Sequence, residues 1–340
     1  MRSVVILATN LLVGVAALVW VVARLGTPAV AVLARHPSPG GIVAFLAVVL
    51  CGFLAHAARL RMIARGLGPV PSLARFTAIR AAGQTVGSLV PSAKVGGDPL
   101  RALLLARAGV PAAAAIASVA VDRALEVGAD VPFAIVFATI LLRQGVPEVR
   151  GAFVSVLVGV AAIVVGLTVA VRRLRSGRGL VTALVKTTRL DRWSLVQGQM
   201  SVLADAELDT TRLIEEPWRL ARAYGFALLA NVAVLVEFAV FLRALDLPHD
   251  GTSVVAAIFA TGAAHSLPVP GAVGVLEGAE TWIFTILGHP PEVGLAIGLA
   301  VRVRELAWVL PGLFYLMGRS VVSASSTGLR PQTAPAKNPG

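Results

Sequence analysis

The sequence is poor in charge and has one cysteine. Charged residues make up 14% of its 340 positions, against about 25% in an average soluble domain. The single cysteine, Cys51, excludes an intrachain disulfide. No cysteine–histidine spacing matches a zinc site, and neither a phosphate-binding loop nor a nucleophile elbow occurs. We therefore expect no enzyme activity, no metal and no cofactor.

Apolar residues dominate the sequence. They make up 57% of it, and the mean hydropathy is +0.83. Several runs of roughly 20 apolar residues could each cross a hydrocarbon core of about 30 Å. The sequence thus predicts an all-α polytopic membrane protein. The net charge of +12 lies mainly in certain loops, as the positive-inside rule predicts, so we expect no nucleic-acid partner.

One pattern of residues occurs twice, 179 positions apart. A constant, ungapped offset of this kind indicates a duplicated unit. The matched positions are Pro91 with Pro270, Asp98 with Glu277, Gly109 with Gly288, Pro111 with Pro290, Arg123 with Arg302, Glu126 with Glu305, and Pro132 with Pro311.

The apolar runs predict six full spans and two shorter segments. The full spans are expected at Val4–Ala23, Ile42–Ala58, Pro111–Leu142, Phe153–Val171, Leu220–Leu242 and Val293–Met317. The shorter segments, Thr77–Val90 and Val254–Leu267, have 14 residues each, and both end at prolines. This length is too short to cross a membrane, so each predicts a re-entrant hairpin, with returning arms at Asp98–Arg107 and Val273–Leu287.

Loop charge predicts the orientation. The loop with Arg59, Arg61, Arg65, Arg75 and Arg80 contains no acid, and residues 172–192 are also basic. Both are expected in the cytoplasm, together with both termini. The two hairpins then enter from opposite sides, so repeats 42–142 and 221–317 are inverted, as in many transporters. We expect one transmembrane domain over residues 1–319, with a cytoplasmic linker at 172–219 that holds a surface helix, and a disordered tail at 320–340.

The interrupted helices suggest a polar cavity. Broken helices are tolerated in a membrane where their backbone is buried in protein or lines such a cavity. Gly96 and Gly97, like Gly271 and Gly274, allow close approach or positive φ. The amides at the start of the returning arm favour an anionic group. Lys94 and Arg101 flank the first turn and could either bind a phosphate or reach the interface.

Ionisable residues recur in the following spans. Asp122, Glu126 and Asp130 share one helix face, and Arg123 lies beside them. In the last span, Arg302 and Glu305 are three positions apart. Buried charges in a membrane usually pair, and they are functional candidates. The expected pairs are Asp98–Arg123 and Glu277–Arg302, as a transport site, as structural links, or as both. His56 and Glu237 have no partner that the sequence reveals.

At these residues the chain resembles the flippase-like family typified by the transmembrane region of lysylphosphatidylglycerol synthases, including stand-alone members without the synthase domain. The first signature stands here as Pro91, Gly96-Gly97-Asp98 and Arg101, and the second as Pro268, Pro270-Gly271-Ala272, Gly274 and Glu277. Asp122-Arg123 fits the family's Asp-Arg pair. Asp98 replaces the usual glutamate, and Ala272 replaces a glycine.

The resemblance implies movement of an anionic phospholipid or lipid-linked headgroup between leaflets of the cell membrane, and no lysyl transfer. Membrane lipids are then the expected partners, and homo-oligomerisation or a partner in envelope biosynthesis stays open. An integral-membrane accessory subunit and, last, an enzyme acting on a lipid phosphate are the alternatives. The expected substrate-binding residues are Pro91, Lys94, Gly96, Gly97, Asp98, Arg101, Asp122, Arg123, Glu126, Pro270, Gly271, Gly274, Glu277, Arg302 and Glu305.

Overall fold

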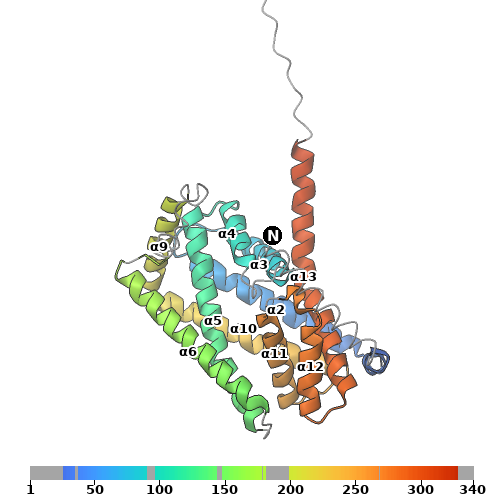
Figure 1. Cartoon of the computed structure of the whole chain (residues 1–340). Helices are drawn as coiled ribbons and strands as arrows, with labels where there is room; N and C mark the ends of the chain where they lie inside the picture. Colours follow the sequence, from blue (N-terminus) through green and yellow to red (C-terminus); the bar gives the residue numbers. More distant parts are fainter. Residues whose placement is uncertain are drawn as a thin grey trace, which may run out of the picture.

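The protein is helical wherever its regular structure is described. The computed structural model describes residues 26–34, 37–89, 96–143, 148–177, 179–180, 199–267 and 269–327 (Figure 1). Within them lie α2 (Pro39–Ala64), α3 (Leu73–Leu89), α4 (Gly97–Ala106), α5 (Ala112–Arg143), α6 (Glu148–Arg175), α9 (Met200–Ile214), α10 (Pro217–Ala244), α11 (Gly251–Ser266), η2 (Pro270–Ala272), α12 (Val275–Ile286) and α13 (Pro291–Thr327).

Local sequence signals fix several helix starts. Ser38 caps α2 by accepting a hydrogen bond from the Gly41 amide at 3.2 Å, and Pro39 is the first helical residue. Asp250 caps α11 by accepting from the amides of Thr252 and Ser253 at 3.0 and 3.2 Å. Both arrangements satisfy amides that a helix N-terminus leaves without partners.

Among the described residues, four helices are long and apolar enough to cross a membrane. They are α2, α5, the part of α6 from Leu157 to Arg175, and α10, which coincide with four of the six expected spans. Several apolar side chains of α6 are exposed, as expected of a face in contact with lipid. The chain is therefore an all-helical membrane protein. The expected first span, Val4–Ala23, lies outside the described residues.

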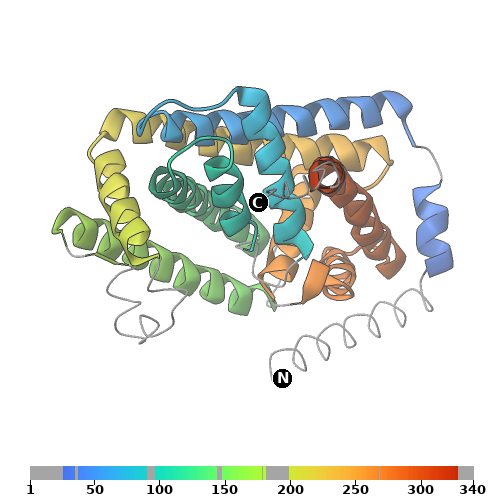
Figure 2. The same cartoon turned by 90° about the horizontal axis from the view of Figure 1, so that it is seen from above.

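Glycines let the helix backbones approach closely. α2 packs along α10 (Figure 2), where a Cβ on Gly41 would lie 2.6 Å from the Ala244 Cβ. In the same way, a Cβ on Gly97 of α4 would overlap the carbonyl oxygen of Gly83 in α3. Gly312 of α13 has the same relation to α3. These crossings bring α3, α4 and α13 close enough for short polar side chains to meet between them.

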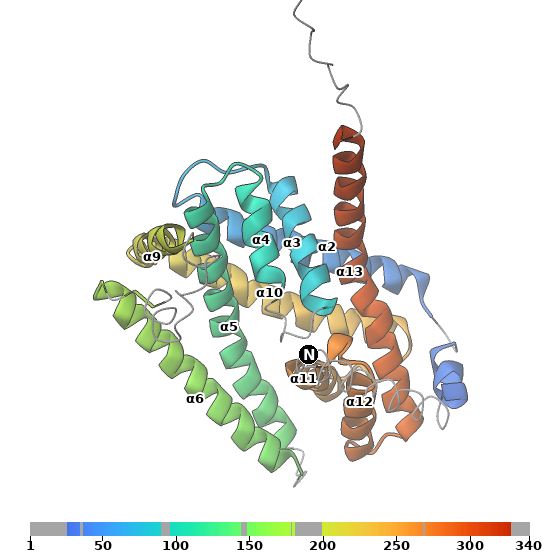
Figure 3. The ribbon, with the colours of Figure 1, turned by 45° about the horizontal axis from the view of Figure 1, so that its top comes forward.

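The two short helix pairs lie on different sides of the molecule. α3 and α4 lie toward the top of the view, and α11 and α12 lie toward the bottom (Figures 1 and 3). Each pair precedes a long helix with an internal proline, Pro132 in α5 and Pro311 in α13. The C-terminal end of α13 projects beyond the other helices (Figure 1) and continues to Thr327, past Ser320, where we expected the tail to begin.

One expectation about the first basic loop is wrong. Arg59 belongs to α2 and Arg80 to α3, and their exposed fractions are 1% and 7%. Both helices extend further toward each other than the apolar runs indicate. Carboxylates of α5 neutralise these two arginines, which allows their burial. Arg59 and Arg80 therefore do not contribute to the charge of a loop.

Candidate functional site

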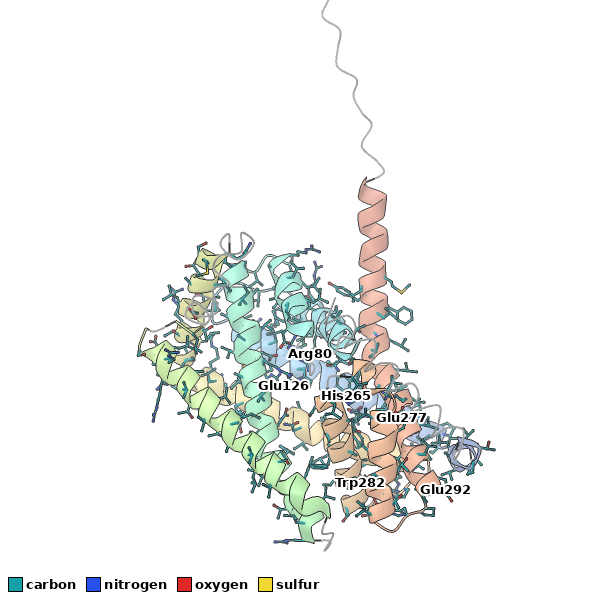
Figure 4. All side chains as sticks on the ribbon, viewed as in Figure 1. Arg80, Glu126, His265, Glu277, Trp282 and Glu292 are labelled. Atoms are coloured by element: carbon teal, nitrogen blue, oxygen red, sulfur yellow. The ribbon has the colours of Figure 1, made fainter. Side chains whose placement is uncertain are left out.

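A polar pocket lies where both short helix pairs meet the long helices. Its volume is about 160 Å³. Arg80, Glu126 and His265 lie in this central region, whereas Trp282 and Glu292 lie toward the bottom of the view, away from it (Figure 4). The residues that line the pocket are His56, Arg80, Gly83, Gln84, Gly87, Ser88, Asp98, Arg101, Arg123, Glu126, Val234, Thr261, His265, Arg304, Glu305 and Trp308.

Asp122 holds three helices together beneath the pocket. It accepts a hydrogen bond from Arg59 Nε of α2 at 2.7 Å and another from Arg101 Nη1 of α4 at 3.0 Å. Asp122 and Arg59 are each 1% exposed. Because a buried charge is costly unless it is paired and hydrogen-bonded, each member of this set requires the others.

Two further carboxylates of this cluster face the pocket. Glu126 lies 3.0 Å from Arg80, 3.5 Å from Arg123 and 3.6 Å from Arg59. Asp98 accepts from Arg101 in the first turn of α4, and it lies 3.9 Å from Arg123. Four guanidinium groups therefore meet three carboxylates (Asp98, Asp122 and Glu126), so the first cluster carries a net positive charge.

A second cluster links α12, α13 and the turn between α11 and α12. Arg302 Nε donates to Glu277 Oε1 at 2.7 Å, and Arg302 Nη1 donates to Glu305 Oε2 at 3.0 Å. The same guanidinium donates to the carbonyl oxygens of Gly271 and Ala272. Glu277 also accepts from the Gly274 amide at 2.9 Å. That amide is therefore used within the protein.

The turn that Arg302 holds has left-handed backbone. Gly271, Ala272 and Gly274 have φ of 58°, 49° and 78°. Glycine adopts such values at no steric cost, whereas a residue with a Cβ is strained by roughly 1–2 kcal/mol. Ala272, which replaces the glycine usual in the resembled family, keeps the glycine-like conformation. Its carbonyl accepts from Arg302 Nη2 at 2.7 Å.

His265 and Glu305 form a pair at the edge of the pocket. His265 Nδ1 lies 2.8 Å from the Thr261 carbonyl oxygen in the same helix. His265 Nε2 lies 2.8 Å from Glu305 Oε1. This contact joins α11 to α13 beside the pocket.

Further polar groups come from α10 and α12. Glu237 Oε1 lies 2.8 Å from Arg304 Nε and accepts from Trp308 Nε1 at 2.8 Å. The Arg304 guanidinium also lies 4.1 Å from the centre of the Phe238 ring. Glu280 is fully buried and accepts from Thr261 at 2.9 Å. Glu237, for which the sequence reveals no partner, thus holds Arg304 at the pocket.

The pocket includes five of the expected site residues. Asp98, Arg101, Arg123, Glu126 and Glu305 line it. Six other expected residues lie in the supporting clusters or turns rather than in the lining, namely Gly96, Gly97, Asp122, Gly271, Gly274 and Glu277. Arg302 likewise lies in the second cluster rather than in the lining. Pro91 and Lys94 lie outside the described residues, as does the side chain of Pro270.

Sequence reasoning missed much of the pocket lining. Arg80 and His265 lie within the short segments that we expected to form hairpins, so their charge in an apolar run was an available signal. Arg304 lies two positions after Arg302, and His56 has no partner that the sequence reveals. His56 Nδ1 is buried and makes no hydrogen bond to the described residues. Asp130, expected on the same face as Asp122, instead accepts from Asn231 at 3.1 Å, away from the cluster.

Comparison with known proteins assigns the family. No curated protein and no solved structure matches the chain. The family model for the lysylphosphatidylglycerol synthase TM region matches residues 6–312, which contain both clusters and the whole pocket. The chain therefore belongs to the family of the transmembrane region of lysylphosphatidylglycerol synthases.

Proposed function

We propose that this protein moves an anionic phospholipid or lipid-linked headgroup between membrane leaflets, with the headgroup in the central pocket. The observation that carries the proposal is the charge of the pocket lining. Four arginines line it, Arg80, Arg101, Arg123 and Arg304, with three carboxylates. Guanidinium groups bind phosphate oxygens through paired, charge-assisted hydrogen bonds, so the lining suits a lipid phosphate.

The correspondence of two helix sets supports a transporter-like architecture. When 179 is added to their residue numbers, the ends of α2, α3 and α4 fall within two residues of the ends of α10, α11 and α12. The first residue of α13 also lies 179 positions after the first residue of α5. The chemistry corresponds too. Arg123 lies between Asp98 and Glu126, and Arg302 lies between Glu277 and Glu305. We interpret the sets as inverted repeats, each with a re-entrant hairpin, in a protein with six full spans.

The proposed topology places this architecture in the cell membrane with both termini in the cytoplasm. The α3–α4 hairpin then enters from the cytoplasm and the α11–α12 hairpin from outside. A headgroup held between them could become accessible to either leaflet as one repeat moves against the other. We propose no chemical transformation of the lipid.

A second function follows if the charges only hold the helices together. Most of the carboxylates and arginines in the two clusters pair with one another. On this alternative the protein is an accessory subunit in envelope lipid or glycan assembly, and the pocket carries no headgroup. The two functions differ in what happens when the pocket is filled and the ion pairs are left intact.

Ser88 allows that test. It lines the pocket, and among the described residues its hydroxyl has one long contact, 3.4 Å from Gln84 Nε2. Ser88→Phe would fill the pocket, and Ser88→Ala is the matched control. The assay measures the outward movement of fluorescent phosphatidylglycerol in proteoliposomes by its bleaching with an impermeant reductant. We expect wild type and Ser88→Ala to move the lipid and Ser88→Phe to lose at least tenfold in rate at equal thermal stability. Equal rates for all three proteins would contradict the proposal.

A further inference from the structure

A second hollow lies between the C-terminal end of α2 and the N-terminal end of α10. It has a volume of about 630 Å³, and none of its lining residues belongs to the central pocket. We call it the arginine groove. It is lined by Ala58, Arg61, Met62, Arg65, Leu73, Glu216, Pro217, Trp218, Arg219, Arg222 and Phe226.

Positive charge dominates this groove. Four arginines line it against one carboxylate, Glu216, which lies 2.9 Å from Arg219. The Arg222 guanidinium lies 5.4 Å from the centre of the Trp218 ring, a cation–π geometry that leaves its N–H groups available. Arg61 donates from Nε to the Pro71 carbonyl oxygen at 3.0 Å, which holds its guanidinium in place. The groove therefore attracts an anion.

The groove continues along α10 as an apolar hollow. The adjoining hollow shares Met62, Arg222 and Phe226 with it and extends to Leu229, which is 55% exposed. The rise from Arg222 to Leu229 is roughly 10 Å along the helix axis. α10 is one of the candidate membrane spans, so this apolar part faces the hydrocarbon region. Trp218, at 70% exposure, has the amphipathic character of a residue at the membrane–water interface.

We propose that the arginine groove is a binding site for an anionic phospholipid, with the phosphate at the arginines and an acyl chain along Phe226 and Leu229. The arginines select for phosphate, and the apolar continuation selects for a molecule that is also a lipid. A soluble anion would use only half of this surface. The proposal concerns binding in the arginine groove and does not depend on translocation through the pocket.

Trp218 provides the test. Its fluorescence is isolated by subtracting the signal of Trp218→Phe, and the purified protein is titrated in mixed micelles with brominated phosphatidylglycerol or brominated phosphatidylcholine. Bromine quenches tryptophan only at short range. We expect the anionic lipid to quench Trp218 at a several-fold lower mole fraction than the zwitterionic lipid. Equal quenching by the two lipids would overturn the proposal.

Variants assign the preference to the arginines. Arg61→Gln/Arg65→Gln leaves Arg222 over Trp218 and should remove most of the preference, because each basic residue near an anionic surface contributes roughly a fivefold effect. Arg243→Gln, at the opposite end of α10 and exposed, should leave it unchanged. A preference that survives the double variant would contradict the assignment. Inorganic phosphate should compete only weakly, and full competition at the same phosphate concentration would mean that the groove binds a small anion instead of a lipid.

Discussion

Asp122→Asn removes one negative charge from between two guanidinium groups. Asp122 is 1% exposed and accepts from Arg59 at 2.7 Å and from Arg101 at 3.0 Å. An asparagine keeps one carbonyl oxygen for one of these contacts, and its amide would face the other guanidinium. Removing one partner of a buried ion pair costs about 3–5 kcal/mol because the remaining charge stays buried without compensation. We expect the free energy of unfolding to fall by that amount.

Asp130→Asn is the matched control on the same helix. Asp130 is exposed and has a hydrogen bond from Asn231, so its substitution should change stability by no more than about 0.5 kcal/mol. Unfolding in mixed detergent and dodecyl sulfate micelles, followed by circular dichroism, measures both variants. If Asp122→Asn loses no more stability than Asp130→Asn, the cluster does not hold α2, α4 and α5 together, and the reasoning is refuted.

Three other predictions concern single sites. Gly97→Ala should cost about 1–3 kcal/mol, because its Cβ would overlap the backbone of α3, whereas Gly159→Ala on α6 meets no atom within 4 Å and should leave thermal unfolding nearly unchanged. Asp250→Ala should cost about 1 kcal/mol by removing the cap of α11. Burial raises the Asp250 pKa, but hydrogen bonds, chiefly from Ser253, lower it more, and the net pKa lies below the ordinary value. The capping contribution is then fully present above the ordinary aspartate pKa and is lost as the pH falls through the lowered one, which a pH series of melting curves for wild type and Asp250→Ala would detect. Glu305→Gln removes the carboxylate that pairs with the α11 histidine and with Arg302, so the temperature of thermal unfolding should fall; an unfolding temperature equal to that of wild type would contradict this.

The positions of the four candidate membrane spans could be predicted from the sequence because apolar runs set them locally. α5 begins one residue after the expected Pro111 and ends one residue after Leu142. The Glu277–Arg302 pair could also be predicted, since the duplicated pattern places both residues at one offset, and it forms at 2.7 Å. Both inferences depend on patterns along the chain rather than on how the helices cross.

The partners of buried charges could not be predicted in the same way. Arg59 lies 63 positions from Asp122, and the contact depends on the angle at which α2 crosses α5. The sequence prediction assigned Arg59 and Arg80 to a loop because it ignored carboxylates from another helix. Glu237 and Arg304 likewise meet only through packing of α10 against α13.

The structure distinguishes two acidic residues as tests of function. Glu277 is 1% exposed, caps α12 and holds Arg302, so Glu277→Gln should weaken folding whatever the function is. Asp98 lies at the pocket, and its partner Arg101 keeps Asp122 when Asp98 is substituted. Asp98→Asn is therefore the better variant for separating transport from stability.

The central claim is that the headgroup of an anionic lipid occupies the pocket between the two hairpins. The chain has one cysteine, Cys51, which is exposed, so Ser88→Cys in a Cys51→Ser background places a single thiol in the pocket. The measurement is the rate at which a small, water-soluble thiol reagent modifies it at rising phosphatidylglycerol content. The account predicts that phosphatidylglycerol slows modification several-fold and that phosphatidylcholine does not. Equal modification rates with the two lipids would contradict it.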